Sequence, residues 1–118
     1  LIMSDGSNVL TYLDSSSLKV VKLLRVTENG YAKDQLNELE YIQGSIYANI
    51  WPGNTIVKIN PADGAVTGVL DLSALEAEAK RLHAASQEMN GIAYDVAKDV
   101  IYVTGKMWPR LYELKISH

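Results

Sequence analysis

The sequence predicts an all-β fold of the β-propeller class, with one inserted helix. Three observations carry this prediction: many short strand-like segments separated by turns, a meander motif that recurs along the chain, and a single stretch of helical periodicity. The chain has 118 residues, of which 47% are hydrophobic and 21% charged. This composition is typical of a globular domain, and the length suffices for one ordinary core.

The predicted strands are rich in β-branched, aromatic and leucine residues, and turn-forming residues such as Pro52-Gly53 and Asp63-Gly64 separate them. They span residues 8–13, 18–26, 36–42, 45–50, 55–59, 64–70, 91–94, 100–104 and 111–116.

One helix is predicted over residues 73–85, inserted between two strands. Ser73 and Glu76 have the spacing of a capping box, which is typical of a helix start. Apolar residues then recur at helical spacing, at Leu72, Leu75, Ala79 and Leu82.

Internal repeats indicate the architecture. Residues 36–41 resemble residues 89–94, which pairs Asn37 with Asn90 at an offset of 53. The next segments, 46–51 and 101–106, repeat at an offset of 55 and pair Trp51 with Lys106. A partial third copy relates residues 8–14 to residues 54–60. Four-stranded meanders that repeat every 40 to 50 residues or so are typical of propeller blades.

The phase of the repeats predicts that residues 1–118 are the C-terminal part of a single propeller domain. We expect a partial blade over 1–35, a blade over 36–72, the helix over 73–85 and the last blade over 89–118. These are about two and a half blades, whereas rings have at least about four, and the chain does not begin with Met. We therefore expect a part of a longer protein that self-associates, or associates with missing N-terminal blades, through unpaired strand edges. The alternative is a small antiparallel sandwich whose hairpins resemble one another by chance.

Composition excludes several classes of function. The formal net charge is −3, and no basic cluster is interleaved with aromatic residues, so we expect no nucleic-acid partner. No apolar run approaches the roughly 18 to 20 residues of a membrane helix, so no membrane partner is expected. The chain has no cysteine and two histidines, which predicts no metal site. No phosphate-binding glycine loop is present, and no cofactor is expected.

Four residues at equivalent positions of the repeats are the candidate site. Asn37 and Asn90 begin the first strand of their units, and Trp51 and Lys106 follow the second, so we expect them to converge at one mouth of the channel. An aromatic face, a cation and carboxamides suit a small polar ligand. Each residue also has a structural interpretation: Trp51 could pack between blades, Lys106 could be a solvated lysine, and the asparagines could bond backbone groups in turns.

The motifs at residues 37–41, 48–51, 90–95 and 104–109 resemble the C-terminal motifs of the plant and bacterial type glutaminyl cyclases, also called glutamine cyclotransferases. The resemblance covers the whole chain and about the last half of the family's length; the family often has Trp where this sequence has Tyr94. It implies a five-bladed propeller and a glutaminyl-peptide cyclotransferase, which converts the N-terminal glutamine of a peptide or protein substrate to pyroglutamate and releases ammonia. It implies no metal or cofactor, and a periplasmic or secreted parent protein.

By the same resemblance, Asn37, Trp51 and Lys106 match residues that line the family's active site. We expect Trp51 to form the pocket wall, Asn37 to hydrogen-bond the substrate amide, and Lys106 to stabilise charge or position a carboxylate; Asn90 joins the substrate-binding set as the repeat partner of Asn37. The family's proton-shuttling glutamate lies on blades before the position that matches Leu1, and Glu38 and Glu40 belong to a different motif. The alternative is a non-catalytic propeller fragment that binds a ligand or a protein.

Overall fold

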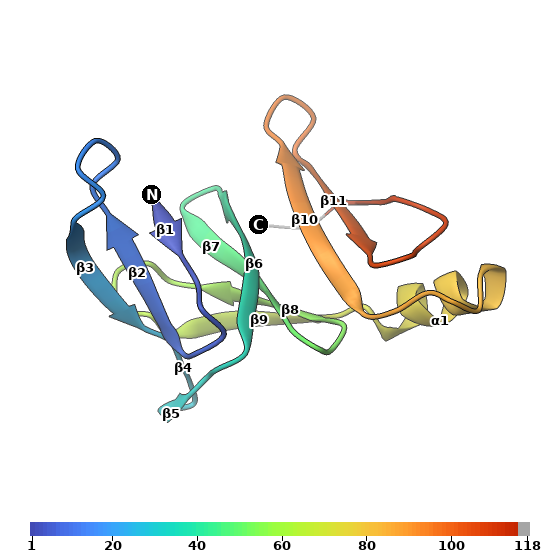
Figure 1. The fold of residues 1–118 in the computed structure, drawn as a ribbon, viewed down its shortest axis with the longest axis horizontal. Helices are drawn as coiled ribbons and strands as arrows, with labels where there is room; N and C mark the ends of the chain where they lie inside the picture. Colours follow the sequence, from blue (N-terminus) through green and yellow to red (C-terminus); the bar gives the residue numbers. More distant parts are fainter. Residues whose placement is uncertain (116–118) are drawn as a thin grey trace.

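The computed structural model describes residues 1–115, which form strands β1 to β12 and helix α1 (Figure 1). The strands are β1 (Ile2–Met3), β2 (Val9–Leu13), β3 (Val20–Arg25), β4 (Thr27–Glu28), β5 (Tyr31–Ala32), β6 (Leu36–Ile42), β7 (Ser45–Ile50), β8 (Thr55–Ile59), β9 (Val66–Asp71), β10 (Met89–Asp95), β11 (Val100–Gly105) and β12 (Tyr112–Leu114). The helix is α1 (Ser73–Leu82).

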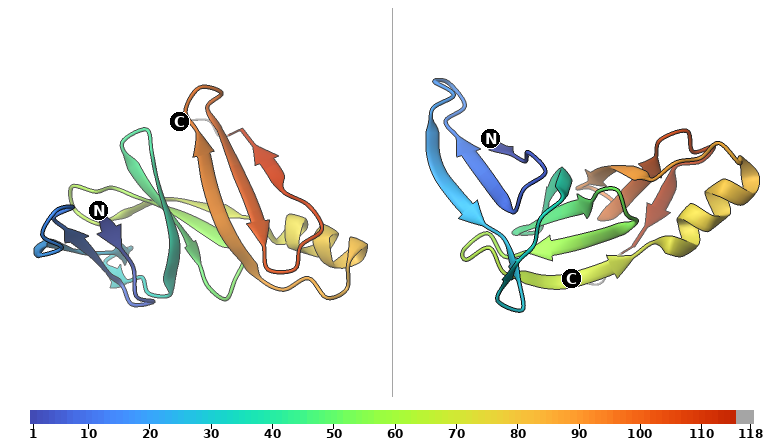
Figure 2. Two further views of the ribbon diagram at one scale, coloured as in Figure 1. Left: turned by 45° about the horizontal axis from the view of Figure 1, so that its top comes forward. Right: turned by 60° about the horizontal axis from the view of Figure 1, so that its bottom comes forward.

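The strands form antiparallel meanders in which each strand pairs with the next along the chain. The orders are β1-β2-β3, β6-β7-β8-β9 and β10-β11-β12, and β4 and β5 form a separate short hairpin. The first and third sheets lie on either side of the second, and α1 lies at the far end beside the third sheet (Figures 1 and 2). The predicted all-β class with one inserted helix is confirmed. The described residues form a row of sheets and not a closed ring.

Two apolar clusters fill the spaces between successive sheets. Leu10 and Leu24 of the first sheet pack with Ile46 and Val57 of the second. On the opposite face of the second sheet, Tyr47 packs in a cluster with Met89 and Ile101 of the third. Because successive side chains of a strand point to opposite faces, neighbours such as Ile46 and Tyr47 belong to different clusters. Burial on both faces explains why β7 is apolar almost throughout, without the alternation of a strand that faces water on one side.

Helix α1 begins differently from the capping-box prediction. Leu72 is the N-cap and makes no side-chain capping bond, while Ser73 is already helical and donates its N–H to Asp71 Oδ1 at 2.9 Å. Glu76 instead accepts a hydrogen bond of 2.6 Å from Asn54 Nδ2 and pairs with Lys80 at 3.2 Å. The capping-box prediction is therefore wrong, because a neighbouring loop binds the carboxylate that the box would need. The helix ends at Leu82 and not at residue 85, since His83 is extended.

Other differences from the predicted elements are small. β3 begins at Val20 and β9 at Val66, each two residues later than predicted, and β10 begins at Met89, two residues earlier. Strands β1, β4 and β5 have two residues each and show no alternation in the sequence. The predicted end of the last strand at residue 116 lies outside the described residues. Within 1–115, no helix is long and apolar enough to cross a membrane.

Candidate functional site

The same β-bulge occurs at the start of β6 and of β10. Leu36 pairs with Ile50 and Leu39 with Ala48, so that two residues, Asn37 and Glu38, lie opposite Asn49 alone. In the third sheet, Met89 pairs with Gly105 and Ile92 with Val103, which leaves Asn90 and Gly91 opposite Thr104. Bulges of this kind redirect side chains and are common beside functional sites. The repeat in the sequence is therefore also a repeat of this local geometry.

The two bulges bring Asn37 and Asn90 into contact. Asn37 Nδ2 donates a hydrogen bond of 3.0 Å to Asn90 Oδ1, which joins the second sheet to the third. Ser4 Oγ of the first sheet's hairpin donates to the backbone carbonyl of Asn37 at 2.6 Å. The structure thus places these asparagines side by side, as their equivalence predicted. Their side chains bond to each other, which differs from the interpretation that they bond backbone groups in turns.

Trp51 directly follows β7 at the same end of the sheets. Its side chain is 47% exposed, so it is not buried between sheets. Its indole Nε1 donates a hydrogen bond of 3.0 Å to Glu88 Oε1. Together with Asn37 and Gln35 it lines a hollow of about 190 Å³ that is open to solvent. Two of the predicted residues therefore border one concavity.

Lys106 directly follows β11, and its backbone is fixed to the segment that precedes β10. Its N–H donates to the carbonyl of Glu88 at 3.1 Å, and its carbonyl accepts from the N–H of Gln87 at 2.8 Å. The side chain is exposed. Lys106 is therefore connected through Glu88 to Trp51. Asn90 is bonded to Asn37, and neither Lys106 nor Asn90 lines the hollow that Asn37 and Trp51 share.

Glu88 is a carboxylate that the sequence analysis missed. A hydrogen bond from its own backbone N–H lowers the pKa of Glu88, and the indole of Trp51 and the positive charges of Lys106 and Lys80 lower it further. It lies 53 positions after Gln35, which lines the hollow, and these two residues directly precede the repeated segments 36–41 and 89–94. Glu88 holds a negative charge beside the indole and the lysine.

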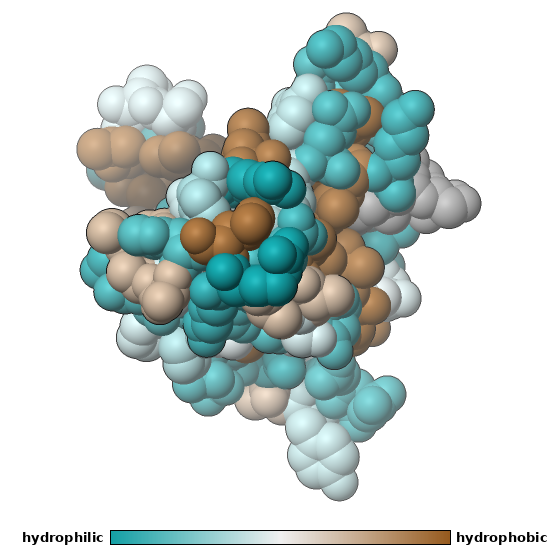
Figure 3. All heavy atoms as spheres, turned by 90° about the vertical axis from the view of Figure 1, so that its right-hand side faces the viewer, coloured by the Kyte–Doolittle hydropathy of each residue, from teal (hydrophilic) through white to brown (hydrophobic). Residues whose placement is uncertain are grey.

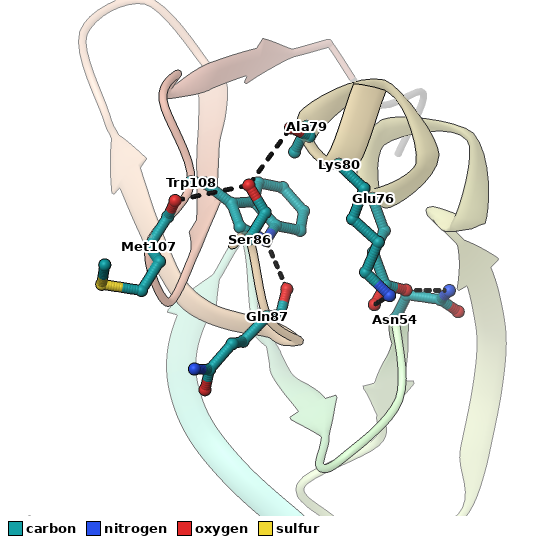
Figure 4. Close-up of polar contacts among 8 residues, drawn as sticks. All are labelled: Asn54, Glu76, Ala79, Lys80, Ser86, Gln87, Met107 and Trp108. Atoms are coloured by element: carbon teal, nitrogen blue, oxygen red, sulfur yellow. Dashed lines mark hydrogen bonds and ion pairs between the residues drawn. The ribbon is translucent and has the colours of Figure 1, made fainter. Parts of the chain in front are cut away.

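The segment before β10 that carries Glu88 is anchored from behind (Figure 4). Ser86 Oγ is buried and donates to the carbonyls of Ala79 in α1 and Met107, at 3.1 and 3.3 Å. Trp108 Nε1 donates to the carbonyl of Gln87 at 2.6 Å. A Cβ at Gly105 would lie 2.2 Å from the Trp108 ring, so this close approach requires glycine. These contacts fix the backbone on which Glu88 and Lys106 stand.

Asn49 is the second residue that the sequence analysis missed. Its side chain is fully buried; Oδ1 accepts a 2.7 Å bond from the N–H of Glu38, and Nδ2 donates a 3.2 Å bond to the carbonyl of Met89. Its signal in the sequence was a carboxamide within the apolar run of residues 45–50. Buried amides in such a run need hydrogen-bond partners and are therefore informative.

The remaining acidic and aromatic residues of the repeats lie elsewhere. Glu40 borders a different hollow with Tyr41, and burial raises its pKa. Tyr94 donates to Asp99 Oδ1 at 2.7 Å, in the part of the third sheet where β10 turns into β11. Among the described residues, no group of three or more His, Cys, Asp or Glu side chains could hold a metal ion.

The face at the helix end of the molecule is mostly hydrophilic, with small hydrophobic areas between the polar groups (Figure 3). Charged residues of α1 contribute to this surface. One of them, Glu78, forms an ion pair of 3.1 Å with Arg110, which lies between β11 and β12. The helix therefore packs beside the third sheet and exposes its charged residues to solvent.

We expect the Trp51 fluorescence to titrate with Glu88. Because the pKa of Glu88 is lowered in the folded chain, its carboxylate keeps accepting from the indole as the pH falls through the ordinary glutamate range, and its stabilising contribution disappears only at lower pH. The Trp51 emission is obtained as the difference between the wild type and Trp51→Phe, which leaves the Trp108 bond to Gln87 in place. It should change below about pH 4.5, the ordinary pKa of a glutamate carboxyl. The Glu88→Gln variant should lack the transition; a midpoint above the ordinary range would contradict the expectation.

Comparisons with known proteins agree on one family. The sequence profile of the glutamine cyclotransferase family matches residues 1–116. A glutaminyl-peptide cyclotransferase of Arabidopsis thaliana is 40% identical over 118 residues, which cover 99% of this chain and 37% of that protein. The crystal structure of a Myxococcus xanthus glutaminyl cyclase superimposes with a TM-score of 0.88 at 37% identity, over 95% of this chain and 49% of that one. The chain thus spans between about a third and a half of the length of these relatives. It belongs to the glutamine cyclotransferase family.

Proposed function

We propose that the protein is a glutaminyl-peptide cyclotransferase and that this chain supplies one part of its active site. The single observation that carries the proposal is the convergence of Asn37, Trp51 and Lys106, with Glu88 between the last two, at one end of the sheets of a family member. The same argument supports blades at residues 1–35, 36–72 and 89–118, with residues 73–85 inserted. The peptide or protein substrate would enter with an N-terminal glutamine.

The reaction makes demands that these residues fit in part. The neutral α-amine of the N-terminal glutamine attacks its own side-chain carboxamide carbon, which forms a ring C–N bond and a tetrahedral oxyanion. A proton then passes from the attacking nitrogen to the departing nitrogen, the C–N bond of the carboxamide breaks, and ammonia leaves. Such chemistry needs a shaped pocket, a group that stabilises the oxyanion, and a proton shuttle.

Each residue in or beside the hollow has a role in this scheme. The Trp51 ring forms a wall against which the glutamine side chain packs. The carboxamide of Asn37 hydrogen-bonds the substrate amide, and Asn90, bonded to it at 3.0 Å, fixes its orientation and extends the polar wall. The charge of Lys106 stabilises the developing oxyanion or positions a carboxylate. Glu88 holds the Trp51 indole through its 3.0 Å hydrogen bond and is a positioning residue. The shuttle carboxylate is assigned to the part of the relatives that this chain does not span.

The test measures loss of ammonia from a peptide with N-terminal glutamine by mass spectrometry. The chain is assayed alone and joined to the preceding half of the Myxococcus glutaminyl cyclase, which replaces the part of the ring that the match does not cover. We expect cyclisation above the spontaneous rate in the hybrid and none with the chain alone, because the shuttle carboxylate is assigned to the part of the relatives that this chain does not span.

Trp51→Ala should lower the kcat/KM of the hybrid by about 10²-fold, since removal of a pocket wall costs both substrate packing and alignment. Val96→Ala, at a 79% exposed position of the β10–β11 turn, is the control and should not change it. A folded hybrid without cyclisation would overturn the proposed function and favour a non-catalytic binding module. Self-association of the chain alone stays a prediction, and its mass in solution tests it.

A further inference from the structure

The buried amide of Asn49 holds both bulges of the site. Its Oδ1 accepts from the N–H of Glu38, the bulge residue next to Asn37, at 2.7 Å. Its Nδ2 donates at 3.2 Å to the carbonyl of Met89, which directly precedes Asn90. The side chain of Asn49 therefore bonds to the residues next to Asn37 and Asn90, the two asparagines that are hydrogen-bonded to each other.

The bulge makes this bond necessary. Where two residues lie opposite one, the extra backbone N–H has no ladder partner. This N–H is partly buried, so leaving it without an acceptor costs free energy, and Asn49 supplies the acceptor from the opposing strand. Only a side chain with both an acceptor and a donor at its tip reaches the second sheet's bulge and the third sheet's backbone together.

The equivalent position one repeat later shows the contrast. Thr104 lies opposite Asn90 and Gly91, as Asn49 lies opposite Asn37 and Glu38. Its hydroxyl donates at 3.2 Å to the carbonyl of Arg110, in the connection between β11 and β12. A shorter side chain can therefore occupy the equivalent position of the third sheet. Of these two residues, Asn49 is the one that links two sheets.

We propose that Asn49 is a positioning residue that aligns Asn37 and Asn90 across the boundary between two sheets, and so sets the geometry of the carboxamide wall of the site. It touches no substrate and acts through the two asparagines. The consequence for turnover rests on the proposed function, whereas the alignment itself does not.

The first experiment tests the alignment on the chain as it is. Amide hydrogen exchange followed by NMR should show the Glu38 N–H protected in the wild type. Protection should fall at least tenfold in Asn49→Leu, which is similar in size and has no polar tip, and the side-chain NH₂ signals of Asn37 should shift. Thr104→Val is the matched control and should leave both unchanged. Equal exchange of Glu38 in Asn49→Leu and wild type would overturn the proposal.

A second variant keeps the test decisive if Asn49→Leu does not fold. Asn49→Thr introduces the residue that the next repeat carries at this position, and a threonine is too short to reach both partners. The Asn37 NH₂ signals should shift in this variant as well; if they match the wild type in a folded Asn49→Thr chain, the proposal fails.

The kinetic arm uses a double-mutant cycle in the hybrid enzyme. Asn49→Thr should raise KM about five- to tenfold, the effect of one misaligned hydrogen bond, with a smaller change in kcat. Added to the Asn37→Ala/Asn90→Ala double variant it should change KM no further, because Asn49 acts through these two asparagines. Additive effects would contradict the assignment. If no hybrid cyclises its substrate, the proposed function fails, and the exchange experiment still decides the alignment.

Discussion

Replacing Lys106 by Met should lower the turnover of the complete enzyme by about 10²- to 10³-fold, the usual cost of removing a group that stabilises transition-state charge. Methionine keeps most of the side chain's length and removes its charge. Lys106 is exposed, and its backbone hydrogen bonds to Gln87 and Glu88 do not depend on the side chain. The fold should therefore be retained, as is usual for substitutions at solvated positions.

The matched control is Lys80→Met. Lys80 also lowers the pKa of Glu88 and pairs with Glu76 at 3.2 Å, but it stands on α1, whereas Lys106 is bonded through its backbone to Gln87 and Glu88. Turnover should be unchanged in this variant. Both substitutions remove a positive charge near Glu88 and should move the Trp51 fluorescence midpoint to higher pH. Loss of turnover in both variants would mean that Lys106 acts only through its electrostatic effect on Glu88. Unchanged turnover in Lys106→Met would remove the lysine from the mechanism.

Replacing Ile101 by Ala should lower the free energy of unfolding by about 2 to 5 kcal/mol, the usual cost of truncating a buried aliphatic side chain. Ile101 is 1% exposed and belongs to the cluster that joins the second and third sheets, together with Tyr47 and Met89. The total stability of a domain is only about 5 to 15 kcal/mol, so the loss is a large fraction. Because the third sheet carries Asn90, Glu88 and Lys106, the site should weaken with the packing.

Urea unfolding followed by circular dichroism measures this loss. The midpoint should fall while the slope stays constant, since the surface exposed on unfolding changes little. Val96→Ala, in the turn that follows β10 and 79% exposed, should leave the midpoint within error. Equal midpoints for Ile101→Ala and the wild type would show that the cluster between these sheets does not stabilise the chain.

The class of fold and most of the strands can be predicted from the amino-acid sequence alone. β-branched and aromatic runs with turn residues between them are local signals, and the repeat pairs Asn37 with Asn90 and Trp51 with Lys106. Equivalent positions of a repeated meander occupy equivalent places, so their gathering at one end of the sheets follows from the repeat alone.

Which partners bind a given side chain depends on contacts that form when the chain folds. Glu76 matches a capping box in the sequence, but Asn54, 22 positions away, binds its carboxylate. Glu88 lies outside the compared motif, and its bond to the Trp51 indole joins residues 37 positions apart. Asn49 appeared as one polar residue in an apolar strand, and its function as a link depends on the carbonyl of Met89 in another sheet. Propensity and periodicity report on neighbours in the chain, whereas hydrogen bonds and burial depend on groups that folding brings together.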